Sequence, residues 1–251
     1  MKLLRYFLVI ILTSVFLRGA NCCAQSPLKI ATEEWPPYVY EQDGKAVGYS
    51  IDILNSVFAK MGVTVTYNQY PWKRAIKGVF SGAADALFHA SKNEERQQYC
   101  YYPEEELTQS RYVFFIRQED VGRLKFDSFD DLIGADVGIT QGYSYTAELL
   151  DFLYANGLAV STVSDESNLR MLAKKRTDYF PTDMLNGLYL VKESGLQDQL
   201  TCLPKPIFEK PYFIIFNKQN VSLEFVERFS RTLAEFKQTE EFRQIEAKYF
   251  E

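Results

Sequence analysis

The chain alternates short apolar runs of strand length with segments that repeat apolar residues at helical spacing. The strand-type runs fall at residues 28–32, 63–67, 86–88, 112–117, 136–140, 160–163, 178–180 and 212–216. The segments with helical spacing fall at residues 50–62, 72–80, 128–132, 145–154, 168–174, 183–192 and 225–249. Strands that alternate with helices of about ten residues are typical of α/β units with a mostly parallel sheet. No repeat or Pro/Gly-rich linker interrupts the pattern, so two lobes would have to be joined by strands.

The composition is that of a globular chain with a hydrophobic core. Of the 251 residues, 47% are hydrophobic and 24% are charged, which argues against intrinsic disorder. The formal net charge of −5 argues against a nucleic-acid partner, because binding to a phosphate backbone depends on a basic stripe. The chain has one histidine and no CxxC or HExxH pattern, so we expect no metal site and no histidine-based catalysis.

Residues 1–24 have the pattern of a cleavable signal peptide. Lys2 and Arg5 give a positive start, residues 6–17 are almost purely apolar, and small residues precede Gln25. An apolar run of about a dozen residues is too short to span a bilayer of ~30 Å as a helix, but it suits the core of a secretory signal. We predict cleavage after Ala24 and export, with an N-terminal membrane anchor as the alternative.

Export changes the meaning of the cysteines. After cleavage only Cys100 and Cys202 remain, in an oxidising compartment. Two cysteines allow one disulfide, but nothing in their spacing shows that they meet, so we favour buried free thiols over a Cys100–Cys202 bond.

Six segments spread along the mature chain carry a family resemblance. They are Ala-Thr-Glu-Glu-Trp-Pro-Pro-Tyr at 31–38, Gly-Tyr-Ser-Ile-Asp-Ile at 48–53, Ser-Gly-Ala-Ala-Asp-Ala at 81–86, Asn-Glu-Glu-Arg at 93–96, the two Thr-Asp pairs within 177–183, and the ending at 245–250. In order and spacing these segments resemble the bacterial extracellular solute-binding proteins of family 3, the polar amino-acid type.

The resemblance implies an α/β fold of two lobes, the type II periplasmic-binding-protein clamp, in which each lobe is a mixed, mostly parallel sheet flanked by helices. Lobe 1 would be built from residues 25–110 and a return segment, 212–251, and lobe 2 from residues 111–211. The chain would cross between the lobes near 107–111 and 210–213. The solute would bind between the lobes, which close over it by a hinge motion.

A free α-amino acid is a zwitterion, so a dry cleft must supply a planar cation for its carboxylate and an anion for its ammonium group. By the resemblance, the carboxylate-clamping arginine of the family falls on Arg96, and its ammonium-binding acid falls on Asp183. Both residues also have a simpler interpretation. Arg96 would then be a surface charge paired with Glu94 or Glu95, and Asp183 would cap the helix that begins there.

The resemblance implies further ligand-binding candidates: Glu33, Trp35, Trp72, His89, Ser91, Thr140, Tyr143 and Ser144. The two tryptophans are alternatively core aromatics, and a lone histidine is often structural. Glu33 and Glu34 compete for one early acidic contact, and their spacing does not separate them. Arg74 is either a second cation of the cleft or part of a solvated face. At the position of Thr140 some members of the family carry a cationic side chain. Here the backbone amides of residues 142–144 would instead donate hydrogen bonds to an anion at the start of the next helix.

These expectations favour a periplasmic protein that captures a small polar solute, an amino acid, for an inner-membrane ABC permease. We expect a monomer with no cofactor and no catalytic residue. Two alternatives stay open. One is an orphan or sensory binding protein of the same fold. The other is an enzyme, since some related proteins dehydrate cyclohexadienyl acids; Glu33, Glu34 and Asp183 are candidates for the general acid that it would need.

Overall fold

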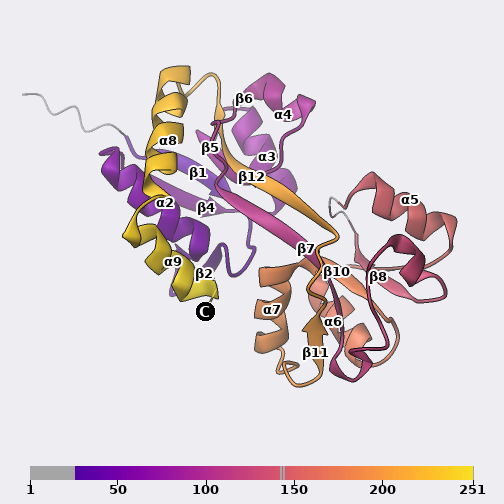
Figure 1. The fold of residues 1–251 in the computed structure, drawn as a ribbon. Helices are drawn as coiled ribbons and strands as arrows, with labels where there is room; N and C mark the ends of the chain where they lie inside the picture. Colours follow the sequence, from indigo (N-terminus) through magenta and orange to yellow (C-terminus); the bar gives the residue numbers. More distant parts are fainter. Residues whose placement is uncertain (1–25, 142, 144, 251) are drawn as a thin grey trace, which may run out of the picture.

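The structure is a computed structural model that describes residues 26–141, 143 and 145–250. The expected signal peptide at 1–24 and the candidate Ser144 lie outside the described residues. Two groups of elements lie side by side, lobe 1 and lobe 2, and two long strands, β7 (Thr108–Arg117) and β12 (Phe208–Asn217), run between them (Figure 1). Each lobe is built of β-strands flanked by helices, and one sheet continues from lobe to lobe through the paired crossing strands, which confirms the predicted α/β class. No helix among the described residues is long and apolar enough to cross a bilayer.

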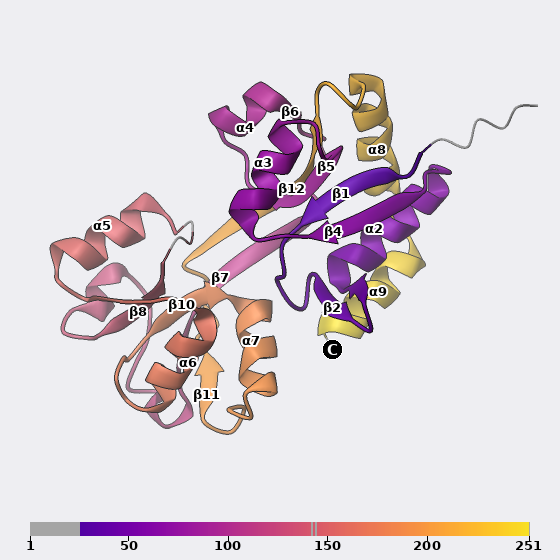
Figure 2. The same ribbon diagram turned by 180° about the vertical axis from the view of Figure 1, so that it is seen from behind.

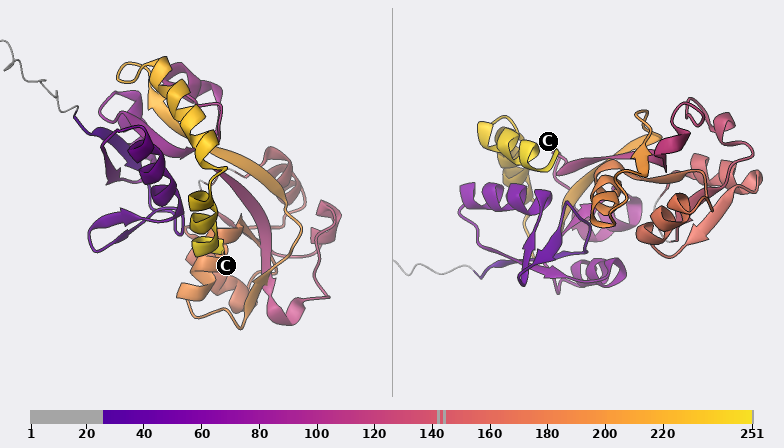
Figure 3. Two further views of the ribbon diagram at one scale, coloured as in Figure 1. Left: turned by 60° about the vertical axis from the view of Figure 1, so that its left-hand side comes forward. Right: turned by 90° about the horizontal axis from the view of Figure 1, so that it is seen from below.

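Lobe 1 contains both ends of the described chain. Its strands are β1 (Leu28–Thr32), β2 (Tyr40–Gln42), β3 (Lys45–Val47), β4 (Val65–Gln69), β5 (Ala86–Ala90) and β6 (Cys100–Tyr101). Its helices are α2 (Tyr49–Lys60), α3 (Trp72–Phe80), α4 (Glu94–Tyr99), α8 (Leu223–Phe236) and α9 (Glu240–Phe250). β1 pairs in parallel with β4 and β5, and β5 pairs antiparallel with β12. The view from below shows α2, α8 and α9 on one side of this sheet and α3 and α4 on the other (Figure 3).

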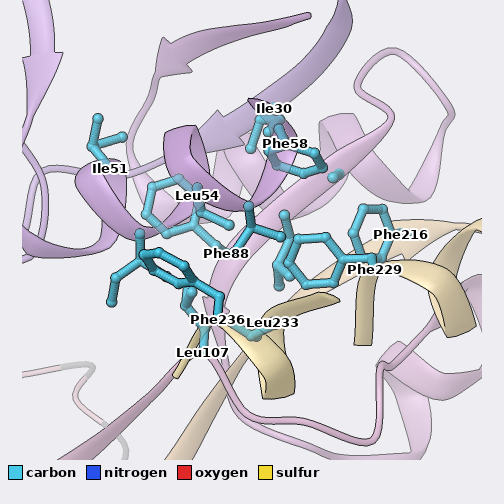
Figure 4. Packing of buried hydrophobic residues seen from close by; sticks show 14 of the residues in the cluster. Ile30, Ile51, Leu54, Phe58, Phe88, Leu107, Phe216, Phe229, Leu233 and Phe236 are labelled. Atoms are coloured by element: carbon cyan, nitrogen blue, oxygen red, sulfur yellow. The ribbon is translucent and has the colours of Figure 1, made fainter. Parts of the chain in front are cut away.

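Both faces of the lobe 1 sheet are buried. On one face Ile30, Phe88 and Phe216 pack against α2 and α8, where the rings of Phe58 and Phe229 lie 5.2 Å apart (Figure 4). The adjacent residues of the same strands face α3 and form a second cluster, which includes Ala31, Leu87 and Ile215. Successive side chains of a strand point to opposite faces, so burial of both faces produces the continuous apolar runs of the sequence.

Lobe 2 is built around β7. Its other strands are β8 (Val137–Thr140), β9 (Ala159–Thr162), β10 (Phe180–Asp183) and β11 (Leu200–Cys202). Its α-helices are α5 (Ala147–Ala155), α6 (Asp165–Ala173) and α7 (Met184–Glu193), as seen from behind in Figure 2. β7 pairs antiparallel with β10 and β11, whereas β8 and β9 are parallel. Two 3₁₀ helices also occur, and the one at Phe129–Leu132 begins with a capping box from Ser128.

The two crossing strands determine where a site between the lobes forms. Residues 108–112 of β7 pair antiparallel with 208–212 of β12, and the remainder of β12 pairs with β5 in lobe 1. The predicted lobe boundaries at 110/111 and 211/212 fall inside these two strands. The antiparallel pairs of β7 and β12 also make the sheets more mixed than the alternating pattern alone suggests, because strands that run out and back between two lobes must be antiparallel to one another.

Candidate functional site

A cavity of about 230 Å³ lies between the lobes. Lobe 1 contributes Glu33, Glu34 and Trp35 after β1, Trp72 at the start of α3, His89 at the end of β5, and Ser91 and Arg96 in the turn and helix that follow. The crossing strands contribute Tyr112 and Tyr212, and the segment after β8 contributes Gln141 and Tyr143. We call this the Arg96 cavity.

Arg96 is held in place by neighbours that leave its charge available. Asn93 caps α4 by accepting a hydrogen bond from the Arg96 backbone N–H at 2.8 Å. The Arg96 Nη1 donates to the Ser91 carbonyl at 2.6 Å and to Ser91 Oγ at 2.9 Å, and the guanidinium lies 5.1 Å from the centre of the Trp72 ring. None of the ion pairs within the described residues includes Arg96. Its guanidinium is therefore a half-buried cation without a bound carboxylate.

Trp35 forms an aromatic wall of the cavity. Its ring stacks on Tyr38 at 4.4 Å and meets the edges of His89 at 5.0 Å and Tyr212 at 5.4 Å. Such contacts fix the orientation of a large flat side chain with little residual freedom. The wall joins lobe 1 to the crossing strand β12 through Tyr212.

His89 is a buried neutral imidazole in a strained backbone conformation. Its side chain is 3% exposed, its φ is 61°, and its Nε2 shares a hydrogen bond of 2.8 Å with Ser50 Oγ. Burial lowers its pKa to about 3, so the ring is uncharged at neutral pH. Its Nδ1 has no hydrogen-bond partner among the described residues. Positive φ values in non-glycine residues gather at functional sites, and here the strain lies at the cavity wall.

Glu33 and Glu34 both line the Arg96 cavity, but their surroundings differ. Glu33 is half-buried, and burial raises its pKa from 4.5 to about 7 while the charge of Arg96 partly opposes that rise. Glu34 is exposed. At neutral pH the cavity thus holds the permanent cation of Arg96 and, in Glu33, a carboxyl group that is close to its titration midpoint.

The raised pKa of Glu33 predicts a pH-dependent stability of the ligand-free protein. The native state binds this proton more tightly than the unfolded state, so the stabilising contribution is complete below about pH 4.5 and is lost as the pH rises through about 7. The difference in free energy of unfolding between Glu33→Gln and the wild type should therefore shift in favour of the variant by about 1–3 kcal/mol as the pH rises from 5 to 8. Thermal denaturation of both proteins across that range measures the difference. A difference that does not change with pH would contradict this assignment. Burial also raises the pKa of Asp165, a residue of lobe 2, but this group titrates in both proteins and its contribution cancels in the difference.

A second cavity of about 530 Å³, here the Asp165 cavity, adjoins the first and is lined mainly by lobe 2. Thr140, at the end of β8, is buried in its wall, and its Oγ1 donates to Asp165 Oδ1 at 2.5 Å. Thr182 Oγ1 donates to the other oxygen of Asp165 at 2.9 Å, and Asn168 Nδ2 donates to Thr140 Oγ1 at 2.9 Å. Burial raises the pKa of Asp165 to about 6, and these hydroxyl donors limit the rise.

Asp183 lines neither of these cavities. Its carboxylate is 1% exposed and caps α7 by accepting from the Asn186 backbone N–H at 3.0 Å. It also accepts from Ser110 Oγ at 2.5 Å and from the Tyr38 hydroxyl at 3.1 Å. Asn186 Nδ2 donates to the Pro36 carbonyl at 2.6 Å beside it. Asp183 therefore lies in the contact between the lobes, with the hydrogen bonds of a helix cap.

A comparison with protein families decides what kind of clamp this is. The model of the bacterial extracellular solute-binding proteins, family 3, matches residues 28–251. The chain belongs to this family. The match covers nearly the whole of the described chain, including both lobes and both crossing strands.

Relatives of this family 3 protein include the L-cystine-binding protein TcyA of Bacillus subtilis (strain 168), which is 25% identical over 231 residues, 89% of this chain and 81% of TcyA. Among solved structures, a histidine kinase sensor domain with similarity to periplasmic binding proteins is 24% identical with a TM-score of 0.71, over 90% of this chain and 96% of that one. An ancestral arginine-binding protein bound to arginine is 23% identical with a TM-score of 0.71, over 90% and 98% of the two chains. The shared fold is the type II periplasmic-binding-protein clamp.

The structure brings most of the candidates of this family 3 protein together. Seven of them line the Arg96 cavity: Glu33, Trp35, Trp72, His89, Ser91, Arg96 and Tyr143. Tyr143 also lines the Asp165 cavity, where Thr140 lies, and Asp183 is set apart from both. Arg74 is exposed and its guanidinium lies 4.5 Å from the Tyr70 ring centre, on the solvated side of α3.

Sequence reasoning missed Tyr112, Gln141 and Tyr212 in the Arg96 cavity, and it missed Asp165 in the second cavity. The tyrosines belong to crossing strands whose apolar runs indicate only burial. Asp165 follows Ser164, the cap of α6, and an acid in the first turn of a helix has an ordinary explanation. Cys100 and Cys202 are free thiols in two different hydrophobic clusters, Cys100 in lobe 1 and Cys202 in lobe 2.

Proposed function

We propose that this family 3 protein captures an amino acid in the Arg96 cavity and hands it to an ABC importer of the inner membrane. The chain would reach the periplasm by the signal at residues 1–24, and would act as a monomer with lobes 25–110 plus 212–251 and 111–211. The observation that carries the proposal is the Arg96 guanidinium, which is preoriented in the cavity and has no acidic ion-pair partner among the described residues.

The geometry around Arg96 suits a carboxylate. A guanidinium offers donors in a planar fork, and a carboxylate accepts two of them side by side. Ser91 and Trp72 hold the guanidinium from two sides, so little side-chain freedom is lost when a ligand arrives. Two similar proteins are named for amino acids, L-cystine and arginine, which supports an amino acid as the class of solute.

The placement of the cavity supports a clamp that closes on its ligand. Arg96 and Trp35 belong to lobe 1, whereas Gln141 and Tyr143 follow β8 in lobe 2. A ligand that touches both lobes binds the closed state better than the open state, and this difference in affinity drives closure. No chemical step is needed for this role, so we propose that the solute leaves unchanged.

A thermal-shift screen on residues 25–251 tests the proposal. The protein is unfolded and refolded to remove carried-over ligand, then tested against amino acids, small peptides, polyamines and organic acids. Ligand at about 100 times its dissociation constant adds roughly 2.7 kcal/mol, which raises Tm by several degrees. A rise with amino acids supports the proposal, and a flat response to every amino acid contradicts it.

The raised pKa of Glu33 favours one second candidate, an enzyme that dehydrates cyclohexadienyl acids. A carboxyl group with a pKa of about 7 in a cavity beside a cation has the property that a general acid needs. Turnover of prephenate or arogenate by the wild-type protein, lost in Glu33→Gln, would establish this activity. No turnover leaves the binding role.

A further inference from the structure

The Arg96 cavity and the Asp165 cavity are adjoining parts of one space. Four residues line both of them: Glu34, Trp35, Gln141 and Tyr143. The second part is the larger, about 530 Å³ against about 230 Å³. A solute anchored at Arg96 that extends past Tyr143 therefore enters the Asp165 cavity.

The two parts differ in charge, because the Arg96 cavity has a guanidinium beside Glu33 and Glu34, whereas the Asp165 cavity has no cation among the described residues of its lining. The residues that line the Asp165 cavity include no lysine and no arginine but five carboxylates: Glu34, Glu41, Asp165, Glu166 and Glu193. None of the five takes part in an ion pair within the described part of the chain. Burial raises the pKa of Tyr143, and the charges of Asp165 and Glu166 in this group raise it further.

Asp165 is the buried member of this group. It is 3% exposed, and it accepts hydrogen bonds from the neutral hydroxyls of Thr140 and Thr182. Its place in the first turn of α6 also favours a negative charge. Buried carboxylates are normally paired with a cation, because taking a charge out of water is costly. Here the chain orients and desolvates the carboxylate but provides no positive side chain for it among the described residues.

We propose that the solute of this protein carries a cationic group at the end far from its carboxylate, and that Asp165 receives this group. The proposal rests on the proposed function, since it takes Arg96 as the site of the solute carboxylate. The class of solute is an amino acid with a positively charged side chain. A solute whose far end carries a carboxylate and no cation, such as L-glutamate, would bring that carboxylate among five others and is disfavoured.

The test compares amino acids matched in size but not in charge. Isothermal titration calorimetry of the stripped protein measures the Kd of L-arginine against L-citrulline, and of L-lysine against L-norleucine, with L-glutamate as a fifth ligand. A charge-assisted hydrogen bond in a partly desolvated site is worth about 1.5–3 kcal/mol. We therefore expect the cationic member of each pair to bind about 10- to 100-fold more tightly, and L-glutamate to bind more weakly than L-arginine.

Two variants assign the preference to Asp165. Asp165→Asn keeps the size of the side chain but removes its charge, and should reduce the preference for arginine over citrulline by about tenfold or more while citrulline binding changes little. Asp151→Asn is the matched control, because Asp151 is an exposed residue of α5 that lines neither cavity and its loss changes the net charge equally. It should leave the preference unchanged.

The outcomes separate this inference from the proposed function. Equal affinity for arginine and citrulline in the wild type overturns the inference and leaves amino-acid binding intact. An undiminished preference in a folded Asp165→Asn protein also overturns it. If Asp165→Asn does not fold, the wild-type ligand ranking still decides. Absence of binding to every amino acid would overturn the proposed function itself, and this inference with it.

Discussion

Replacing Arg96 by alanine should weaken the binding of any α-amino acid by about 100-fold or more, with little loss of stability. The loss removes two parallel charge-assisted hydrogen bonds to the ligand carboxylate and leaves that carboxylate desolvated without a partner. Stability should change little because Arg96 makes no ion pair within the described residues, and its contacts to Ser91 and Trp72 are at the cavity surface. Calorimetric titration gives the change in Kd, and thermal denaturation without ligand gives the change in Tm.

Two further variants sharpen this experiment. Arg96→Lys keeps the charge but loses the planar fork, so its affinity should lie between those of wild type and Arg96→Ala. Arg74→Ala removes a nearby exposed arginine that lines neither cavity, and should bind amino acids like the wild type. Clear binding of amino acids by Arg96→Ala would contradict the carboxylate site. An equal loss in Arg74→Ala would mean that general positive charge, not the guanidinium of Arg96, attracts the ligand.

The regular elements with long buried faces were predictable from the sequence. The strand at 28–32 and the helix at 72–80 have the predicted bounds, because in both the apolar spacing alone determines which residues are buried. The long segment at 225–249 was predicted as one helix but forms two, α8 and α9, with a break at 237–239. Thr239 lies in that break and its hydroxyl accepts from the Phe242 N–H, a local capping contact that apolar spacing does not detect.

The elements that escaped prediction are short and partly exposed. The hairpin of β2 and β3 and the helix α4 carry few buried apolar residues, so the spacing of apolar residues does not predict these elements. The strands β7 and β12 each begin before the apolar run from which they were predicted. The additional residues, 108–111 and 208–211, alternate in burial, and they lie where the two strands pair between the lobes. Pairing across about one hundred residues of sequence is decided by tertiary contacts.

The candidate site was predictable where a motif carried it. The turn and helix that hold Ser91 and Arg96, and the segment that holds Glu33 and Trp35, were found by resemblance, and these residues share one cavity. Asp165 was not found, because it lies in α6 while its partners Thr140 and Thr182 come from the strands β8 and β10 and are distant in the sequence. A first-turn acid is ordinary in isolation, and only the assembled lobe shows that this one is buried beside a cavity.

Replacing Asp183 by alanine should destabilise the ligand-free protein by about 2–4 kcal/mol. The substitution removes the cap of α7, an effect of about 1 kcal/mol, and leaves the buried hydroxyls of Ser110 and Tyr38 without their acceptor. Burial raises the pKa of Asp183, so part of this loss is offset by the removal of a costly charge. Urea denaturation at neutral pH measures the difference, and Tyr38→Phe, which removes only one of the donors, should cost less.

The family resemblance leaves two roles open for Asp183, a ligand of the solute ammonium group or a helix cap, and a second substitution separates them. If Asp183 bound the ammonium group of the solute, Asp183→Asn would weaken amino acids more than ligands that lack an ammonium group. Its hydrogen bonds to α7, β7 and Tyr38 instead predict that Asp183→Asn changes the affinity for both kinds of ligand equally. A selective loss of amino acids, in a variant as stable as the wild type, would contradict the cap and place the carboxylate at the solute. An equal change would make Asp183 the hydrogen-bonded link between the lobes, whose contribution to binding is to hold α7 beside Tyr38.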